Sequence, residues 1–402
     1  MVRARAGAGA LLTVALIGWL TGFWFVYDGW WHRRFFWWFL APTAVITLPL
    51  VWRREPWDRW CLITAALLLF QALSRTWSSG ETLTEVAGMS DTLAVALLLT
   101  ALFLLARHFL PFRAAYLMAL PLISAVVMGA SLPLFYSDHA LAADRFCDVF
   151  VYESGLNPIL TGLLCATAAL HAAALLAASE RRSGKILWGA VLALHVFALC
   201  ATQSRTPMIA MVVGLGALGA FQRKHALVPV LTCVGAATAY YLAVLLPGTG
   251  GDGVSDLVAR GSTGRLSIYQ WFLGDMGLRS FLIGRGMASP AEIPEDVLGW
   301  FVHHPHSSYL TQLYLTGLVG LALLAAVLAI ASHRAFQLAR KGDAIWLSLL
   351  AGHALAVAVD GAQIFSLQSI PRIEFILLAV PATLAVALAR PPAVKGPEAE
   401  GP

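Results

Sequence analysis

Charged side chains are scarce in this sequence, and their scarcity excludes a soluble globular domain. Charged residues make up 12% of the 402 residues, hydrophobic residues make up 59%, and the mean hydropathy is +0.74. Soluble domains are about 25% charged. Many apolar runs reach roughly 17 residues, which is enough to cross a bilayer core. Because a soluble fold could not bury so many uniformly apolar helices, the sequence predicts an all-α integral membrane protein.

Motifs of several other protein classes are absent. The five cysteines contain no Cys-x-x-Cys pair, and four of them fall in apolar runs, which argues against a disulfide framework or a structural zinc site. The chain has neither the glycine-rich phosphate loop of nucleotide hydrolases nor the His-Glu-x-x-His motif of zinc peptidases. We therefore expect no metal, no cofactor and no nucleic-acid partner.

Hydrophobic runs predict about twelve membrane spans within one polytopic domain, residues 1–402. The spans are expected at residues 8–27, 35–51, 60–74, 89–106, 114–132, 156–178, 186–202, 206–221, 226–247, 306–330, 344–365 and 372–389. With the N-terminus in the cytoplasm, 17 Lys or Arg residues lie on the cytoplasmic side and 10 on the other. This bias and the even number of spans place both termini in the cytoplasm.

Three segments of the sequence have alternative interpretations. Residues 8–27 follow basic residues, as in a signal peptide, but an A-x-A-like cleavage site is missing, so we interpret them as a retained span. The aromatic and basic residues 30–38 could form a ligand cage, although interfacial anchoring is the better interpretation. The tail, residues 391–402, is rich in Pro, Gly and Glu and is expected to be disordered.

The longest connection, residues 248–305, is predicted to lie outside the cytoplasm between the ninth and tenth spans. Arg265 opens an expected amphipathic helix that contains Tyr269, and Arg285 lies between glycines that permit close backbone approach. Long loops cross membranes regardless of their charge, so the arginines alone do not require a function. Their local context nevertheless favours short helices that present cations to a substrate.

A further arginine lies at the predicted external break between two apolar helices. Arg205 follows Gln203, with Thr206 as the expected N-cap and Pro207 as an early helical residue. A helix start beside an arginine favours an anion site. The alternative is an arginine whose head group extends to the membrane interface.

Three histidines end the long connection and precede the tenth span. His303, His304 and His306 could bind a metal, but Pro305 interrupts their spacing and no nearby Cys, Asp or Glu completes a ligand set. Histidine has an unperturbed pKa of about 6.5 and can act as a general base at neutral pH. We therefore favour a base at His306, while His303 and His304 stay possible.

Two carboxylates have both structural and functional interpretations. Asp360 lies near the external end of the eleventh span, where a carboxylate is costly and tends to be paired. It either satisfies another helix or orients a catalytic cation or the acceptor. Asp275 could pair with Arg279 four residues later and make that arginine structural.

Four short motifs, in this order, resemble those of the O-antigen ligases. They are residues 203–206 (Gln-Ser-Arg-Thr), residues 262–265 (Ser-Thr-Gly-Arg, with Trp271 following), residues 283–286 (Ile-Gly-Arg-Gly), and His306-Ser307 followed after nine residues by Gly317-Leu318-Val319-Gly320. The resemblance covers about residues 195–365. It is shared with O-antigen polymerases and protein O-oligosaccharyltransferases.

The resemblance implies a GT-C-like glycosyltransferase of the Gram-negative inner membrane, with residues 248–305 in the periplasm. Its donor would be an undecaprenyl-diphosphate-linked O-antigen and its acceptor the lipid A-core oligosaccharide, with membrane lipids around both. Arg205 and Arg265 would hold the diphosphate and His306 would accept the proton of the attacking hydroxyl. Further substrate contacts are expected from Arg285, Gln203, His303, His304, Tyr269 and Asp360.

Two other functions use the same residues. A transporter of an anionic lipid or solute would place arginines near the midplane at a repeat interface, whereas these lie in external segments of a chain without a fixed repeat. An O-antigen polymerase would use a polyprenyl-linked glycan as acceptor. The form of the histidine motif and the single long loop favour the ligase.

Overall fold

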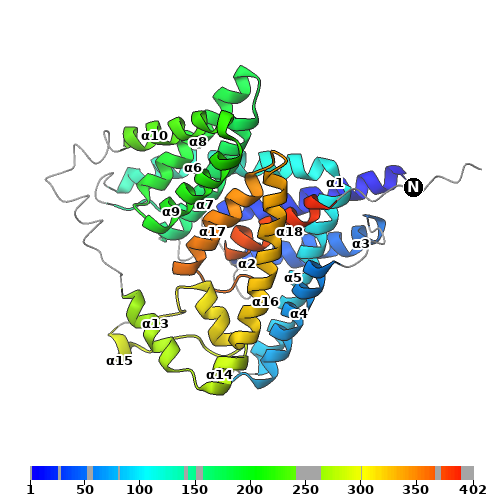
Figure 1. The fold of residues 1–402 in the computed structure, drawn as a ribbon, viewed down its shortest axis with the longest axis vertical. Helices are drawn as coiled ribbons and strands as arrows, with labels where there is room; N and C mark the ends of the chain where they lie inside the picture. Colours follow the sequence, from blue (N-terminus) through cyan, green and yellow to red (C-terminus); the bar gives the residue numbers. More distant parts are fainter. Residues whose placement is uncertain are drawn as a thin grey trace, which may run out of the picture.

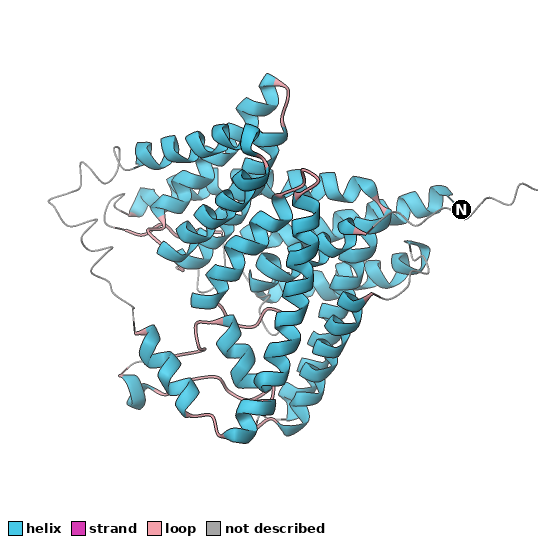
Figure 2. Ribbon diagram, viewed as in Figure 1, coloured by secondary structure: helices cyan, strands magenta, loops and turns pink. Residues whose placement is uncertain are grey.

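The computed structural model describes residues 2–25, 29–51, 58–79, 82–139, 144–150, 157–240, 264–299, 301–366 and 373–390. Within these ranges the chain is helical, and its β structure is limited to an isolated bridge between Ile293 and Val302 (Figure 2). Predicted features outside the described residues are the tail 391–402 and the first part of the long connection (248–263), which includes the Ser-Thr pair at 262–263.

The described chain consists of long apolar helices and a few short ones (Figure 1). The long and medium helices are α1 (Val2–Thr21), α2 (Gly29–Phe35), α3 (Ala41–Val51), α4 (Arg59–Ser74), α5 (Thr82–His108), α6 (Leu110–Asp138), α7 (Pro158–Ala178), α8 (Arg182–Ala201), α9 (Arg205–Phe221), α10 (Arg223–Tyr240), α16 (Ser308–Ala339), α17 (Ile345–Val359) and α18 (Val380–Ala389). The shorter elements are 3-10 turns at Gly22–Trp24 and η3 (Arg75–Trp77), π-helical turns at Phe36–Leu40 and Phe375–Ala379, and α13 (Arg265–Gly274), α14 (Leu278–Ile283) and α15 (Glu295–Leu298).

Eight segments of the described chain are long and apolar enough to cross a membrane, which confirms the all-α membrane class. They are Ala4–Trp24, Trp31–Val51, Arg59–Trp77, Ser90–His108, Leu110–Asp138, Pro158–Ala178, Arg182–Ala201 and Ser308–Ala339. The other four predicted spans coincide with shorter apolar helices, Arg205–Phe221, Val228–Ala237, Ile345–Val359 and Phe375–Ala389. The total of twelve spans therefore stays a prediction.

Small residues let the helices of the core approach one another closely. A Cβ added to Gly352 in α17 would lie 2.4 Å from the carbonyl oxygen of Ala210 in α9. Ser348 in α17 donates to the carbonyl of Gly214 in α9 at 2.7 Å. Small residues and interhelical hydrogen bonds are the usual means of helix association in a bilayer, where apolar burial gives little driving force between helices. α17, which ends at the candidate site, is thus held rigidly against α9.

The glycine-rich part of α16 breaks the helix. Gly317 has φ of 66° and ψ of −170°, a backbone conformation that favours glycine. A Cβ on Gly317 would lie 2.4 Å from the backbone nitrogen of Ile283 at the end of α14. Just beyond, the N–H of Gly286 donates to the carbonyl of Leu315 at 2.8 Å. The break therefore creates a docking place for α14 and the residues that follow it.

Asp148, in the connection between α6 and α7, is expected to make the stability of the protein depend on pH. Its side chain is fully buried, and one of its oxygens accepts from the N–H of Phe150 at 3.0 Å. Burial raises the pKa of Asp148 from 3.8 to about 6. The pKa of Asp148 is higher in the folded state than in the unfolded state, so the protonated carboxyl group contributes to the free energy of unfolding. This contribution is fully present below about pH 4 and is lost as the pH rises through about 6.

The variant Asp148→Asn carries no charge at any pH and should remove this dependence. We expect it to match the wild type at pH 4 and to be more stable at pH 7.5, by about 3 kcal/mol for a shift of this size. Thermal unfolding in detergent at both pH values measures the difference. Asp138→Asn, at an exposed position nearby, is the control. Equal melting of Asp148→Asn and the wild type at pH 7.5 would contradict the prediction.

Candidate active site

His306 lies two residues before α16 in a conformation that few residues adopt. The N-cap of the helix is Ser307, whose hydroxyl accepts from the N–H of Leu310 at 3.4 Å. His306 has a positive φ of 53°, and its N–H donates to Nδ1 of His304 at 3.1 Å. Left-handed backbone at a non-glycine residue costs free energy and is concentrated at functional sites. The local fold thus fixes the direction of this imidazole.

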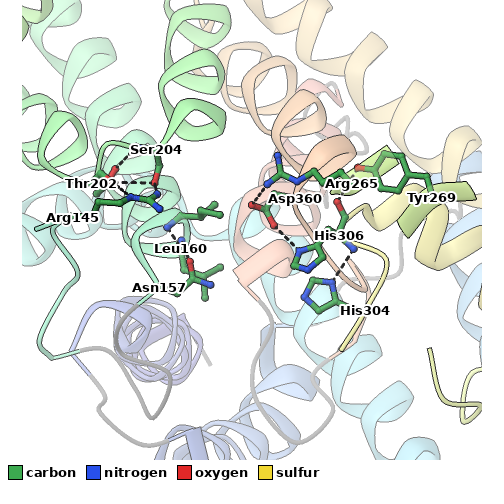
Figure 3. Close-up of polar contacts among 11 residues, drawn as sticks. Arg145, Asn157, Leu160, Thr202, Ser204, Arg265, Tyr269, His304, His306 and Asp360 are labelled. Carbon is green, nitrogen blue, oxygen red and sulfur yellow. Dashed lines mark hydrogen bonds and ion pairs between the residues drawn. The ribbon is translucent and has the colours of Figure 1, made fainter. Parts of the chain in front are cut away.

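One carboxylate joins the predicted base to a predicted cation. Asp360 Oδ1 lies 3.4 Å from Nδ1 of His306, and Asp360 Oδ2 lies 3.0 Å from Nη2 of Arg265 (Figure 3). The Asp360 side chain is 12% exposed, whereas those of Arg265 and His306 are 25% and 37% exposed. The carboxylate is therefore shielded, and the two groups it holds keep access to solvent. Within the described chain, the imidazole of His306 makes its polar contact through Nδ1, which leaves Nε2 without a hydrogen-bond partner.

The short helix α13 makes a further contact with the group formed by Asp360, Arg265 and His306. Arg265 is the first residue of α13, and Tyr269, one turn later, donates its hydroxyl to the carbonyl of His306 at 3.3 Å. Burial raises the pKa of Tyr269, so the hydroxyl stays protonated at neutral pH. Arg265 and Tyr269 thus lie on the same side of α13 and hold both the carboxylate and the backbone of the predicted base.

The position of Asp360 is set by the end of α17. The helix was predicted to reach residue 365, but it ends at Val359, and Asp360 adopts extended backbone with φ of −158° and ψ of 98°. The N–H of Ala362 then donates to the buried carboxylate of Glu374, and Ser366 donates to Asp91 at 2.9 Å. Two further carboxylates therefore anchor the segment that follows Asp360.

Replacing Asp360 by asparagine should slow the reaction without unfolding the protein. The amide keeps the shape of the side chain but removes the charge that orients both Arg265 and His306. Loss of an orienting group of this kind typically costs roughly tenfold to a hundredfold in activity. Turnover and expression level of Asp360→Asn are the measurements, and Asp343→Asn is the control, because Asp343 pairs with Arg113 at the other end of α17. Full turnover with normal expression would make Asp360 structural.

The predicted anion site at Arg205 is a tight turn between α8 and α9. The N-cap of α9 is Ser204 rather than the predicted Thr206, because the helix already begins at Arg205. Gln203 has a positive φ of 48°, which closes the turn. Arg205 is half-buried and is the first residue of α9. The turn therefore places Gln203 two residues before Arg205 at the start of α9, and the anion site stays a prediction.

A second arginine, which the sequence analysis did not single out, supports this turn. Arg145 donates through Nε to the carbonyl of Thr202 at 3.1 Å and through Nη2 to the hydroxyl of Ser204 at 2.8 Å. In Figure 3 this turn lies to one side and the Asp360 group to the other. The sequence did carry a signal for Arg145, because it is a cation in a connection predicted to be external, against the positive-inside trend.

Arg285 belongs to a different cluster. Its Nη2 lies 2.7 Å from Asp275 Oδ2, and its guanidinium lies 5.2 Å from the ring centre of Tyr314. The Tyr314 hydroxyl donates to the same carboxylate oxygen at 2.7 Å. Asp275 thus pairs with Arg285, and not with Arg279 as considered from the spacing. His303 also lies apart, since it is exposed and its ring packs on Phe301.

No group of three or more His, Cys, Asp or Glu side chains suited to a metal ion occurs in the part of the chain that the structure describes. The polar groups that converge at Asp360 are instead an imidazole, a guanidinium and a carboxylate.

Comparison with known protein families gives a match to part of the chain. Residues 188–325 match the O-antigen ligase family. The suspected relationship to this family is thereby confirmed over that region.

The match to the O-antigen ligase family runs from α8 to the second part of α16. It includes Arg205, Arg265 and His306, whereas Asp360 lies beyond it. The matched domain is that of a superfamily of ligases, polymerases and oligosaccharyltransferases, which are glycosyltransferase-like enzymes with lipid-linked polysaccharide and lipid substrates. No curated protein matches the chain.

Proposed function

We propose that the protein is an O-antigen ligase, which transfers a polysaccharide from undecaprenyl diphosphate to a hydroxyl of a lipid A-core sugar. The observation that carries this proposal is the contact of Asp360 with both Arg265 and His306. Such a group combines a cation for an anionic leaving group with a base for an attacking hydroxyl. These are the two requirements of glycosyl transfer from a diphosphate.

The donor needs orientation and charge neutralisation more than activation. Diphosphate is a good leaving group, and arginine suits it because the guanidinium stays cationic and binds phosphate oxygens with a planar fork. Arg265 presents such a fork at the start of α13, and Arg205 another at the start of α9. Both would stabilise the charge that develops as the glycosidic bond breaks.

The acceptor needs a base. His306 Nδ1 contacts Asp360, so Nε2 is the nitrogen left to accept the proton of the acceptor hydroxyl. The acceptor oxygen then bonds to the anomeric carbon while the bond from that carbon to the diphosphate oxygen breaks. The diphosphate leaves with the bonding electrons. One direct displacement of this kind inverts the anomeric carbon.

Both substrates are lipids, so the reaction belongs at a membrane surface. We place it on the periplasmic side of the bacterial inner membrane, with both termini in the cytoplasm. The long connection, residues 248–305, and the tail, residues 391–402, would then lie on opposite sides. Openings between helices toward the bilayer would admit the polyprenyl donor and the lipid A acceptor.

An O-antigen polymerase or a protein O-oligosaccharyltransferase would use the same donor with the same residues. Gene deletion separates these possibilities by a gel of lipopolysaccharide. Loss of the ladder with an intact core supports a ligase, a core that carries one repeat unit indicates a polymerase, and an unchanged ladder contradicts both. Transfer by purified protein in excess chelator and without ATP would further exclude a transporter, which moves its substrate unchanged.

A further inference from the structure

A pocket separate from the Asp360 group lies between η3 and α14. Its volume is about 450 Å³, and it is lined by Trp77, Ser79, Gly277, Leu278, Arg279, Ser280, Gly284 and Arg285. It contains two guanidinium groups but no His, Asp or Glu among its lining residues. With no group that accepts or donates a proton near neutral pH, the pocket is suited to binding rather than to catalysis.

The pocket carries a net positive charge. Arg285 is balanced by Asp275 at 2.7 Å. Arg279 is exposed, and within the described chain it has no carboxylate at ion-pair distance. One cation is thus left to bind an anion. The planar fork of arginine matches carboxylate and phosphate oxygens alike, and phosphate is the anion that the head groups of phospholipids carry.

The surroundings of the pocket are apolar and exposed. Leu278, Phe281 and Leu282 lie at i, i+3 and i+4 on one face of α14 and are 78%, 40% and 45% exposed. Trp77 ends a candidate membrane span, Arg59–Trp77. Tryptophan is enriched where spans meet water, and a helix with one apolar face lies naturally in that interface. Both features are typical of a segment at the level of lipid head groups.

The apolar face of α14 is fixed in this position by the broken helix α16. A Cβ on Gly284, which follows α14, would lie 2.1 Å from the carbonyl oxygen of Leu315. The N–H groups of the next two residues, Arg285 and Gly286, donate to carbonyls of α16 at 3.0 and 2.8 Å. α14 cannot turn its apolar residues inward without breaking these contacts. A permanently exposed apolar face beside a cation calls for an amphiphile as its ligand.

We propose that this pocket binds the phosphate head group of an anionic phospholipid of the surrounding bilayer, with Arg279 on the phosphate and the acyl chains along α14. A phospholipid meets both requirements at once, because it brings one anion and an apolar chain to the same place. The inference concerns a second lipid site and does not depend on the proposed glycosyl transfer. Its occupant would fasten α14 to the membrane surface.

Binding of phosphatidylglycerol to the purified full chain tests this proposal. The protein is titrated with phosphatidylglycerol, with phosphatidylcholine and with inorganic phosphate, and bound lipid is counted by native mass spectrometry. We expect phosphatidylglycerol to bind best and Arg279→Ala to weaken it roughly tenfold, as for one lost charge-assisted contact. Arg182→Ala, at an exposed arginine at the start of α8, should have no effect.

A second variant, Leu278→Gln, tests the apolar half of the site and should weaken the lipid without affecting inorganic phosphate. Equal binding by Arg279→Ala and the wild type would overturn the proposal. So would inorganic phosphate that binds as tightly as the lipid, because the chains would then contribute nothing. Displacement of phosphatidylglycerol by purified lipid A-core in the wild type but not in Arg279→Ala would reassign the pocket to the acceptor. None of these outcomes requires transfer activity.

Discussion

Turnover is expected to fall by roughly 10²–10⁴-fold in His306→Ala, while binding of the donor survives. A fall in turnover of this size is typical when a general base is removed. Donor affinity should survive because His306 contacts Asp360 and does not lie on the proposed diphosphate path.

Donor affinity and turnover of His306→Ala, measured side by side in detergent, give the test. His303→Ala is the matched control, because His303 is exposed and packs on Phe301 outside the Asp360 group. His304→Ala should have an intermediate effect, since its ring supports the backbone of His306. A larger loss of turnover in His303→Ala or His304→Ala than in His306→Ala would identify that residue as the base. Loss of donor binding in His306→Ala would place it on the phosphate instead.

Replacing Arg265 or Arg205 with alanine should weaken donor binding and also slow the chemical step. The lost guanidinium contacts an anion that gains charge in the transition state, so each variant should lose roughly 10²–10³-fold in turnover. Lysine keeps the charge but not the planar fork, so Arg265→Lys should recover only part of the loss. The measurements are donor affinity and turnover for both arginines.

Arg285→Ala is the informative control for these two variants. Its guanidinium is held by Asp275 and lies over Tyr314, away from the Asp360 group. We therefore expect lower thermal stability with nearly unchanged donor affinity. If Arg285→Ala lost donor binding while Arg205→Ala and Arg265→Ala kept it, the diphosphate would have to be placed at the pocket beside α14.

Hydropathy located the helices because apolar runs are the strongest signal in a membrane protein, but it could not give their ends. α16 continues to Ala339, well beyond the predicted residue 330, because its polar last turns stay helical through contacts such as Arg334 to Gln337 at 3.1 Å. α17 ends earlier than predicted, at Val359, because the next residue is drawn out of the helix by its carboxylate contacts.

The candidate site was predictable as a set of residue types, but not as a geometry. Asp360 lies 95 positions from Arg265 and 54 from His306, and no spacing rule connects residues so far apart. The pairing of Asp275 with Arg285 instead of Arg279 has the same origin, because the break at Gly317 brings α14 and Tyr314 together. Arg145 escaped notice for a similar reason, since its partners lie more than 50 positions away.

The two oxygens of Asp360, one on Arg265 and one near His306, also bear on the order in which the substrates act. A diphosphate that takes the Arg265 guanidinium competes with one of these oxygens and leaves the carboxylate to align the imidazole alone. Occupancy of one substrate site and readiness of the other are then thermodynamically linked. We expect compulsory-order kinetics, with the donor first and the acceptor productive only afterwards.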